Sequence, residues 1–323
     1  MCKVIGIDIS KASFDVSYEK SDGEFVHFKL TNNIKGFHKL LKVIEKTDHC
    51  IMEATGPYYL SLAQYLFEKG IKVSVVNPLQ VKHFVRMRMV KAKTDKKDAR
   101  MIALYGQSEH PDLWEPDEQP IMQIHQLNAA IEGLKKQTTM LKNRMEAFSQ
   151  IPDNDTNVMK ELRSLLRVME SKTAKLEKRL LEITKQHYEQ TFRLVTDIPA
   201  IGPKTAIMLI AITNNFQKFN DAKKLSSYVG LSPRIYQSGT SVHGKGHITK
   251  MGNSQMRKLL YLCSWSAKRC NSQCKAMYER MSEKGKPERV IKTAIANKLL
   301  RQAFAIGKSL SDYQENYQKT FVF

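Results

Sequence analysis

The 323-residue sequence has no hydrophobic run long enough to cross a membrane, since a spanning helix needs about 20 consecutive apolar residues. Its first residues, MCKVIGIDIS, carry charge where a secretion signal needs an apolar core. The five cysteines are an odd number without framework spacing, and the pair Cys270 and Cys274 lacks the second pair that a zinc site requires. These absences argue against a membrane or disulfide-rich protein and predict a cytoplasmic chain with reduced thiols.

Acidic residues are scarce in one part of the chain. The whole sequence has 52 Lys and Arg against 32 Asp and Glu, a formal net charge of +20. Residues 191–323 hold 22 of these basic residues but only 7 of the acidic ones, which places +15 of the charge there. An imbalance this local favours a polyanionic partner, most often nucleic acid, over a merely solvated surface.

The first part of the chain, residues 1–115, alternates strand and helix patterns. Three segments rich in β-branched and aromatic residues come first, at 3–9, 12–19 and 25–31. Helical patterns then alternate with two short apolar strands, CIMEA and IKVSVV. This order predicts an α/β domain in which helices flank a mixed sheet.

The rest of the chain reads as mainly helical. Residues 116–190 repeat apolar residues every three or four positions, with a break at IPDND, which predicts two long helices in an antiparallel hairpin or coiled-coil arm. Such an arm suits spacing or self-association as well as plain packing. Basic helical sequence fills 191–323. Its IPAIG segment (198–202) is similar to a helix-hairpin-helix turn, whose amides bind phosphate, although a tight turn between packed helices explains it equally well.

Acidic residues stand out at particular places in the α/β part. Asp8 interrupts the apolar strand VIGIDIS, where an unpaired buried carboxylate would be costly, and Glu53 lies in the strand CIMEA. Asp95 and Asp98 fall in the first turn of a predicted helix capped by Thr94, so both project from one face. A single such acid is usually an ion-pair partner or a cap. Four together in a basic protein favour a shared site for a hard cation, Mg²⁺ or Mn²⁺.

The order of these acids resembles the ribonuclease-H-like fold of Holliday-junction resolvases, in which paired metals act on a phosphodiester. Basic residues beside the aspartates then predict contacts with substrate phosphates: Lys91, Lys93, Lys96, Lys97 and Arg100. In the basic C-terminal part the candidate nucleic-acid contacts are Lys204, Arg234, Lys245, Lys250, Arg257 and Lys258.

One serine in the basic part is a candidate nucleophile. Ser238 falls in a polar, glycine-rich segment, YQSGTSVHGKG, which predicts a loop surrounded by cations. A serine in that setting can attack phosphorus, although Ser-Gly pairs are common in loops and spacing alone says little. Tyr236 is a second candidate for the same role.

Several blocks together resemble a known family. They are GIDISKASFDV, MEATGPY, KTDKKDAR and GLSPRIYQSG followed by ITKMGNSQMRKLL. In this order they are similar to the DEDD-type transposases of bacterial insertion sequences, the IS110 family, which includes a pilin-gene-inverting recombinase. The resemblance implies that Asp8, Glu53, Asp95 and Asp98 bind metal and that Ser238 is the nucleophile. It also implies donor and target DNA as substrates and a structured non-coding RNA as guide.

The resemblance further implies a mechanism and a setting. Ser238 attacks a DNA phosphodiester to give a phosphoserine, and a freed hydroxyl of the partner strand later reverses this step at a new end. Because the acids and the serine lie in different parts of the chain, we expect a homodimer or tetramer, with a composite site between protomers as the hypothesis to test. Such a protein is expected in the bacterial cytoplasm, on the nucleoid during recombination, and not in a membrane.

Other interpretations stay open at this point. The chain could be a metal nuclease or junction resolvase in which water attacks and Ser238 is structural. It could be a nucleic-acid-binding regulator without chemistry. As a third alternative, GIDISKASFDV could be the first phosphate loop of an actin-like or sugar-kinase ATPase, although no convincing second glycine-rich loop follows.

Overall fold

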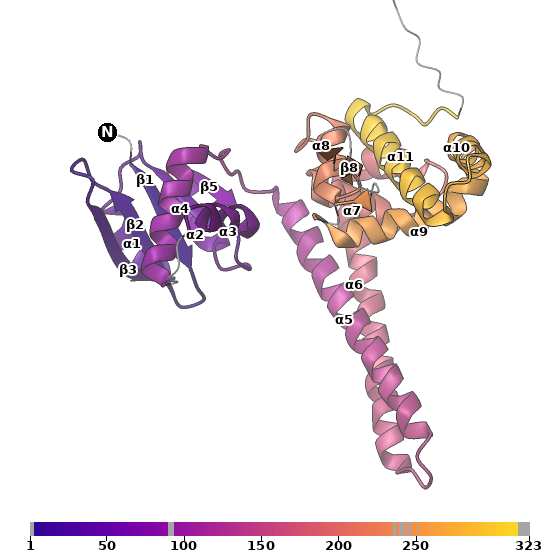
Figure 1. The fold of residues 1–323 in the computed structure, drawn as a ribbon. Helices are drawn as coiled ribbons and strands as arrows, with labels where there is room; N and C mark the ends of the chain where they lie inside the picture. The colour runs from indigo at the N-terminus through magenta and orange to yellow at the C-terminus, as the bar shows by residue number, and fades with distance from the viewer. Residues whose placement is uncertain are drawn as a thin grey trace, which may run out of the picture. The chain divides into compact units, whose positions relative to one another are not determined.

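The structure is a computed structural model that describes residues 3–89, 94–234, 237–238, 242–243, 247–249 and 251–315. Figure 1 shows its fold. The chain divides into two compact units, Met1–Pro116 and Asp117–Phe323, and each has a hydrophobic core. Within the described ranges, no helix combines the length and the apolar character needed to cross a membrane.

The described part of the first unit is built on a five-stranded mixed sheet. Its strands lie in the order β3-β2-β1-β4-β5. The first three pair antiparallel, while β4 pairs parallel with both β1 and β5. The strands are β1 Val4–Ile9, β2 Ser13–Glu19, β3 Phe25–Thr31, β4 His49–Glu53 and β5 Lys72–Val76. The predicted mixed sheet, which begins with three consecutive strands, is confirmed.

Helices pack on both faces of this sheet. In the described residues they are α1 Ile34–Leu41, α2 Leu60–Glu68, α3 Pro78–Met87 and α4 Asp95–Glu109. Successive side chains of β1 point to opposite faces of the sheet. Ile5 and Ile7 belong to the core formed with α1 and α2, whereas Gly6 lies against α4 on the other face. The hydroxyl of Thr94 accepts a hydrogen bond from the Lys97 amide, so the predicted cap of α4 is confirmed.

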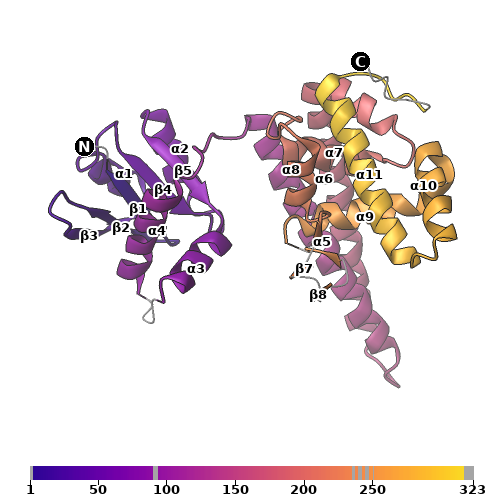
Figure 2. The same cartoon turned by 45° about the horizontal axis from the view of Figure 1, so that its top comes forward.

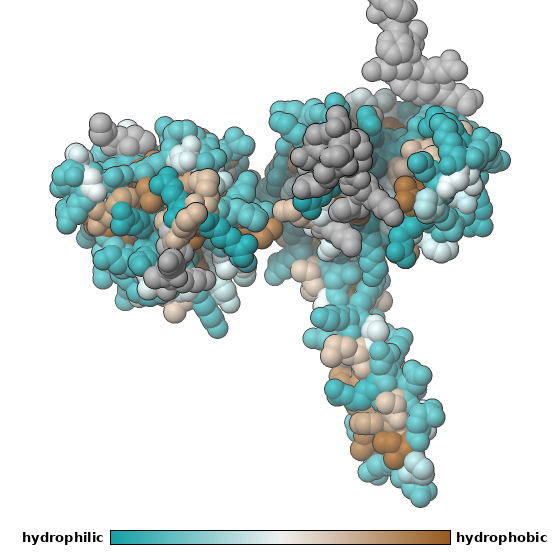
Figure 3. Space-filling view, viewed as in Figure 1, coloured by the Kyte–Doolittle hydropathy of each residue, from teal (hydrophilic) through white to brown (hydrophobic). Residues whose placement is uncertain are grey.

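The second unit opens with two long helices, α5 Gln119–Ser149 and α6 Thr156–Thr196. Ion pairs fix their relative direction: Lys135 pairs with Glu177, and Lys142 with Glu170, so residue numbers rise along one helix and fall along the other. The predicted antiparallel pair is confirmed, and Figure 1 shows it projecting from the other helices of this unit. Figure 3 shows apolar side chains toward its outer end. The exposed ones include Met140, Ile151, Val158, Leu165 and Val168.

The remaining helices of this unit pack together around α11, whose inner side chains are fully buried. They are α7 Pro203–Thr213, α8 Ala222–Val229, α9 Ser254–Cys270, α10 Ser272–Glu283 and α11 Glu288–Ser309. Short strands form two antiparallel pairs, β6 Pro233–Arg234 with β9 His247–Ile248 and β7 Gln237–Ser238 with β8 Val242–His243. The prediction of a loop at Ser238 is therefore wrong, because a two-residue strand is too short to show periodicity in the sequence.

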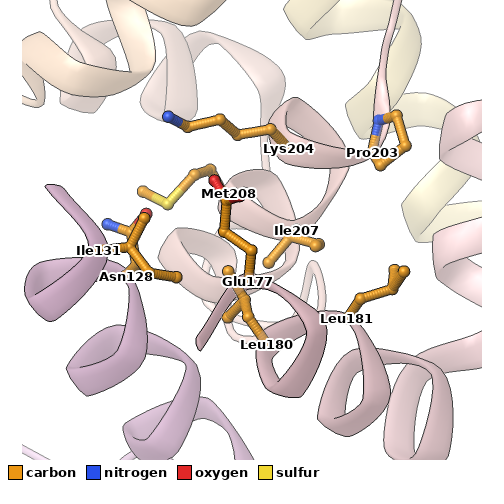
Figure 4. Close-up of a pocket in the computed structure, with 9 residues that line it drawn as sticks. All are labelled: Asn128, Ile131, Glu177, Leu180, Leu181, Pro203, Lys204, Ile207 and Met208. Atoms are coloured by element: carbon orange, nitrogen blue, oxygen red, sulfur yellow. The ribbon is translucent and has the colours of Figure 1, made fainter. Parts of the chain in front are cut away.

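A cavity of about 170 Å³ lies between α5, α6 and α7 (Figure 4). Aliphatic side chains such as Ile131 and Ile207 form much of its lining. The polar side chains at its edge have protein partners, since Lys204 pairs with Glu132 at 2.6 Å and Asn128 bonds to a glutamine of α9. The cavity is therefore a gap in helix packing rather than a site with spare polar groups.

Candidate active site

The register of the sheet places two of the predicted acids side by side. Strands β1 and β4 are parallel, with Ile7 opposite Met52. Asp8 and Glu53 follow these residues on adjacent strands and share the face of Gly6, the face that α4 covers. Both acidic residues are half-buried. The sheet thus fixes one pair of carboxylates without any contribution from loops.

Close backbone contact fixes α4 on this face. A Cβ at Gly6 would lie 2.1 Å from the carbonyl oxygen of Ala99, near the start of α4. A Cβ at Gly106, near the end of the helix, would lie 2.8 Å from the side chain of Val4 at the start of β1. The helix therefore runs antiparallel to β1, and its first turn lies at the end of β1 that carries Asp8.

The first turn of α4 brings the other two acids to the same end of the face. Burial, followed by the charges of Asp98, Asp95 and Glu53, raises the pKa of Asp8 to about 6. Asp8 therefore interacts electrostatically with each of the other three predicted acids. Across the described residues, no three carboxylate, imidazole or thiol groups stand at the separations of a preformed metal site.

A group of residues that sequence reasoning missed completes this site. Asp15 lies opposite Asp8 in the β1–β2 ladder and is only 5% exposed. Its carboxylate lies 2.8 Å from His27 Nε2 and 3.1 Å from Lys29 Nζ. Lys29 Nζ also lies 3.4 Å from Asp95 Oδ2, so one ammonium group links the sheet to α4. The alternation of FVHFKLT, which puts both basic side chains on one face, is the signal that could have identified them.

Several predicted phosphate contacts lie beside these acids. Lys96 and Lys97 are exposed in the first turn of α4. The guanidinium of Arg100 lies 4.2 Å from the centre of the Phe25 ring, within cation–π range. Lys91 and Lys93 fall outside the described residues. The exposed lysines extend the positive surface next to the carboxylates, where a phosphate backbone can bind.

The basic candidates of the second unit differ in their surroundings. Arg257 donates a hydrogen bond to the carbonyl oxygen of Val229 at 2.8 Å and thus supports the turn after α8, whereas Lys204 forms the ion pair with Glu132. The backbone of Ser238 belongs to β7, and its side chain is outside the described part. Arg234 and Lys258 are exposed, and Lys245, Lys250 and Tyr236 lie outside the described residues.

The turn that is similar to a helix-hairpin-helix element lies between α6 and α7. Gly202 caps α7, and Ala200 has a φ of 82°. This left-handed region favours glycine, the residue that such turns usually have at this position. The geometry of the turn therefore follows that of the motif despite the alanine, and phosphate binding by its amides stays a prediction.

Comparison with known proteins bears on both units. Residues 5–151 match a family model described as transposase, and residues 192–279 match the model of the transposase IS116/IS110/IS902 family. The pilin gene-inverting protein of Moraxella lacunata is 32% identical over 94% of this chain and 94% of its own. The transposase for insertion sequence element IS1111A of Coxiella burnetii is 23% identical over 80% of this chain and 76% of its own.

These matches and the two-unit fold define the class as a transposase, an enzyme that cleaves DNA and transfers its strands. More particularly, the chain belongs to the IS116/IS110/IS902 transposase family. The resemblance found in the sequence blocks is thereby confirmed.

Proposed function

We propose that this transposase cuts and rejoins DNA through a covalent serine intermediate, at a site that combines its four acidic residues with Ser238. The observation that carries the proposal is the convergence of Asp8, Glu53, Asp95 and Asp98 at one end of the sheet face under α4. The strand order β3-β2-β1-β4-β5 supports the ribonuclease-H-like architecture predicted from the sequence. Each acid is held by a regular element, which favours a reproducible geometry.

The carboxylates fit a hard divalent cation, Mg²⁺ or Mn²⁺. They offer oxygen donors, and because burial and then the neighbouring carboxylates raise the pKa of Asp8, an added positive charge is favourable there. The resemblance of the sequence blocks to DEDD-type transposases likewise implies a divalent metal at these four acids. When bound by Asp8, Glu53, Asp95 and Asp98, such a cation would polarise the phosphate and stabilise the leaving oxygen. Thr55 Oγ1 donates a hydrogen bond to Glu53 Oε1 at 2.9 Å, which orients that carboxylate.

Ser238 supplies the nucleophile in this mechanism. Its hydroxyl oxygen forms a bond to phosphorus, the bond from phosphorus to one deoxyribose oxygen breaks, and the proton ends on the released sugar oxygen. The free hydroxyl of a partner strand then attacks the phosphoserine, which restores the serine and joins a new pair of ends. Lys96 and Lys97 hold the phosphate backbone beside the acids.

A structured non-coding RNA guides the reaction in this proposal, as the family resemblance implies. The support within this chain is its charge of +20, because scattered Lys and Arg bind phosphates without reading sequence. Sequencing of the RNA that copurifies with the protein tests the idea. One enriched structured RNA is expected, and a copurified pool that matches total cellular RNA would reject guidance.

Self-association is the next part of the proposal. The apolar residues exposed toward the outer end of the α5–α6 hairpin, which include Leu165 and Val168, suit a contact between copies. A homodimer or tetramer then lets the acids of one protomer serve Ser238 of another. Mixing inactive Asp8→Asn and Ser238→Ala proteins is expected to restore part of the activity. Two variants that stay inactive together would place the site within one chain.

A covalent-adduct experiment tests the nucleophile. Incubation of the wild type with labelled DNA is expected to give a protein–DNA adduct that survives denaturation. The adduct should be absent with Ser238→Ala and present with Tyr236→Phe. Cleavage that occurs without any adduct would favour a resolvase in which water attacks, and an adduct lost only in Tyr236→Phe would identify the tyrosine.

Substitution of an acid separates catalysis from binding. Asp95→Ala is expected to abolish cleavage while DNA binding persists, because its carboxylate belongs to the metal site and not to the phosphate-binding surface. Asp22→Asn, in an exposed turn of the same unit, is the matched control and should keep full activity. Full activity of Asp95→Ala would instead fit a regulator, and tight ATP binding would fit the kinase-like alternative.

A further inference from the structure

One helix of the second unit carries an exposed tryptophan. Trp265 on α9 is 52% exposed, although tryptophan is among the largest apolar side chains. Lys258, Leu262 and Arg269 are exposed on the same helix. Along the chain, Leu262 follows Lys258 by four residues, Trp265 follows Leu262 by three, and Arg269 follows Trp265 by four. These intervals put all four side chains on one face. We call Lys258, Leu262, Trp265 and Arg269 the α9 stripe.

A buried lysine holds the ring of Trp265. Lys292 of α11 is 3% exposed, and its Nζ lies 3.3 Å from the centre of the ring, within cation–π range. Glu288 Oε1 lies 2.9 Å from this Nζ and 3.2 Å from Lys268 Nζ. Figures 1 and 2 show α9 and α11 side by side. One face of the indole is therefore fixed by the protein, while half of the side chain stays open to solvent.

We propose that the α9 stripe binds single-stranded nucleic acid, with an unpaired base stacked on the open side of Trp265. Lys258 and Arg269 lie on either side of the ring along the helix and bind the flanking phosphates. Aromatic side chains between cations are the usual means of holding single strands, because every base has a face that can stack. A duplex keeps its base faces inside the stack and offers none to an aromatic ring.

Charge complementarity favours nucleic acid over a second copy of this chain. Residues 191–323 carry a formal charge of +15. A two-fold contact between two α9 stripes would bring Lys258 and Arg269 against cations of the same kind, which opposes association. A polyanion neutralises the same residues and gains the stacking contact as well.

The proposed role of the α9 stripe belongs to the second unit, whereas the carboxylate site belongs to the first. This role shares with the proposed function only the premise that the chain binds nucleic acid. It requires neither the metal nor Ser238.

Fluorescence gives a direct test, because the sequence has two tryptophans. In Trp114→Phe, Trp265 is the single emitter, and titration uses mixed-sequence oligonucleotides of about 12 nucleotides as DNA, as RNA and as the matching duplex. Single strands are expected to quench the emission at saturation, whereas the duplex does not. The single strand that binds more tightly, DNA or RNA, identifies which nucleic acid the α9 stripe binds. Emission unchanged by bound single strands, or quenched equally by duplex, would overturn the inference.

Affinity measurements on the intact chain complete the test. Trp265→Ala is expected to bind the labelled single strand roughly 5-fold to 150-fold more weakly, whereas Trp265→Tyr keeps most of the affinity. Ile34→Ala, at a position 54% exposed on α1, is the matched control and should bind as the wild type does. Thermal melting of each variant shows that it is folded, and the tyrosine variant preserves a ring over Lys292 if the alanine variant unfolds.

The outcomes separate this inference from the proposed function. Equal affinities of the wild type and folded Trp265→Ala would overturn the inference and leave the proposed function intact. Absence of any nucleic-acid binding by the wild type would overturn the premise of both. Emission that changes with protein concentration alone would identify a second copy as the occupant and so overturn the assignment to nucleic acid.

Discussion

Asp8 is held among negative charges, which makes its proton binding depend on folding. The usual pKa of an aspartate is 3.8, whereas burial and the neighbouring carboxylates raise the pKa of Asp8 to about 6. The folded state therefore binds this proton more tightly than the unfolded state. Stability from this source is present below pH 3.8 and is lost as the pH rises through about 6.

Asp8→Asn is expected to remove this loss. In EDTA, the free energy of unfolding of Asp8→Asn minus that of the wild type should increase from pH 4 to pH 7 by on the order of 1–2 kcal/mol, allowing for solvent screening. Urea unfolding at the two pH values measures the change. Asp22→Asn, in an exposed turn, should follow the wild type. The same pH dependence in Asp8→Asn and wild type would contradict the electrostatic account.

The ammonium of Lys29 contacts both Asp15 and Asp95, and Asp95 is one of the proposed metal ligands. Lys29→Met is therefore expected to bind Mn²⁺ roughly 3- to 10-fold more tightly, because the metal no longer competes with the ammonium for Asp95. Titration calorimetry measures the affinity. Lys35→Met, exposed on α1, is the control. An unchanged affinity in Lys29→Met would show that the two cations do not compete.

At the scale of elements, the sequence predicted the features that depend on residues close together in the chain. Thr94 caps α4, and Asp95 and Asp98 lie in its first turn as their spacing indicated. The register that sets Asp15 opposite Asp8 could not be predicted, because strand alternation assigns a face without naming the cross-strand partner. The contact between Lys29 and Asp95 joins residues 66 positions apart and depends on how α4 packs, which no local pattern contains.

The packing of α4 on β1 gives a prediction for Gly6. Gly6→Ala is expected to lower the free energy of unfolding by about 3 kcal/mol, because the new Cβ would lie 2.1 Å from Ala99 O and 2.3 Å from Ala103 N. Gly133→Ala, at an exposed position of α5 where the new Cβ would meet no atom beyond its own helix backbone within 4 Å, should instead raise it by about 0.5–1 kcal/mol. Chemical denaturation compares them. Equal effects would mean that α4 shifts freely on the sheet.

The turn before α7 gives a second prediction for an element. Ala200→Gly is expected to raise the free energy of unfolding by about 1 kcal/mol, since glycine adopts a φ of 82° without the strain that a Cβ imposes. Ala206→Gly, at a buried helical position of α7, should lower it by about 1 kcal/mol or more. Thermal and urea unfolding measure both. A destabilised Ala200→Gly would show that the turn carries no strain.

At the scale of the whole molecule, the charge of +20 makes nucleic-acid binding depend on ionic strength. If the chain contacts six or more phosphates, its affinity for duplex DNA should fall on the order of 10³-fold between 50 and 200 mM salt. Fluorescence anisotropy measures this, and Lys96→Ala should reduce the slope of log affinity against log salt by about 1. Affinity that hardly changes with salt would show that few phosphates are bound.

Where α4 packs on β1, Gly6 lies directly against the main chain of α4, and Gly106 lies directly against side chains of the sheet. Main-chain spacing changes less than side-chain packing when a core is redesigned. At Gly6 the separation of α4 from β1 is thus set by main-chain atoms of Ala99 and Ala103, whereas at Gly106 it depends on the side chains of Val4 and Ile51. Laboratory selection for heat resistance can therefore change core residues other than Val4 and Ile51 without altering the spacing of the four acids, provided that both glycines are kept.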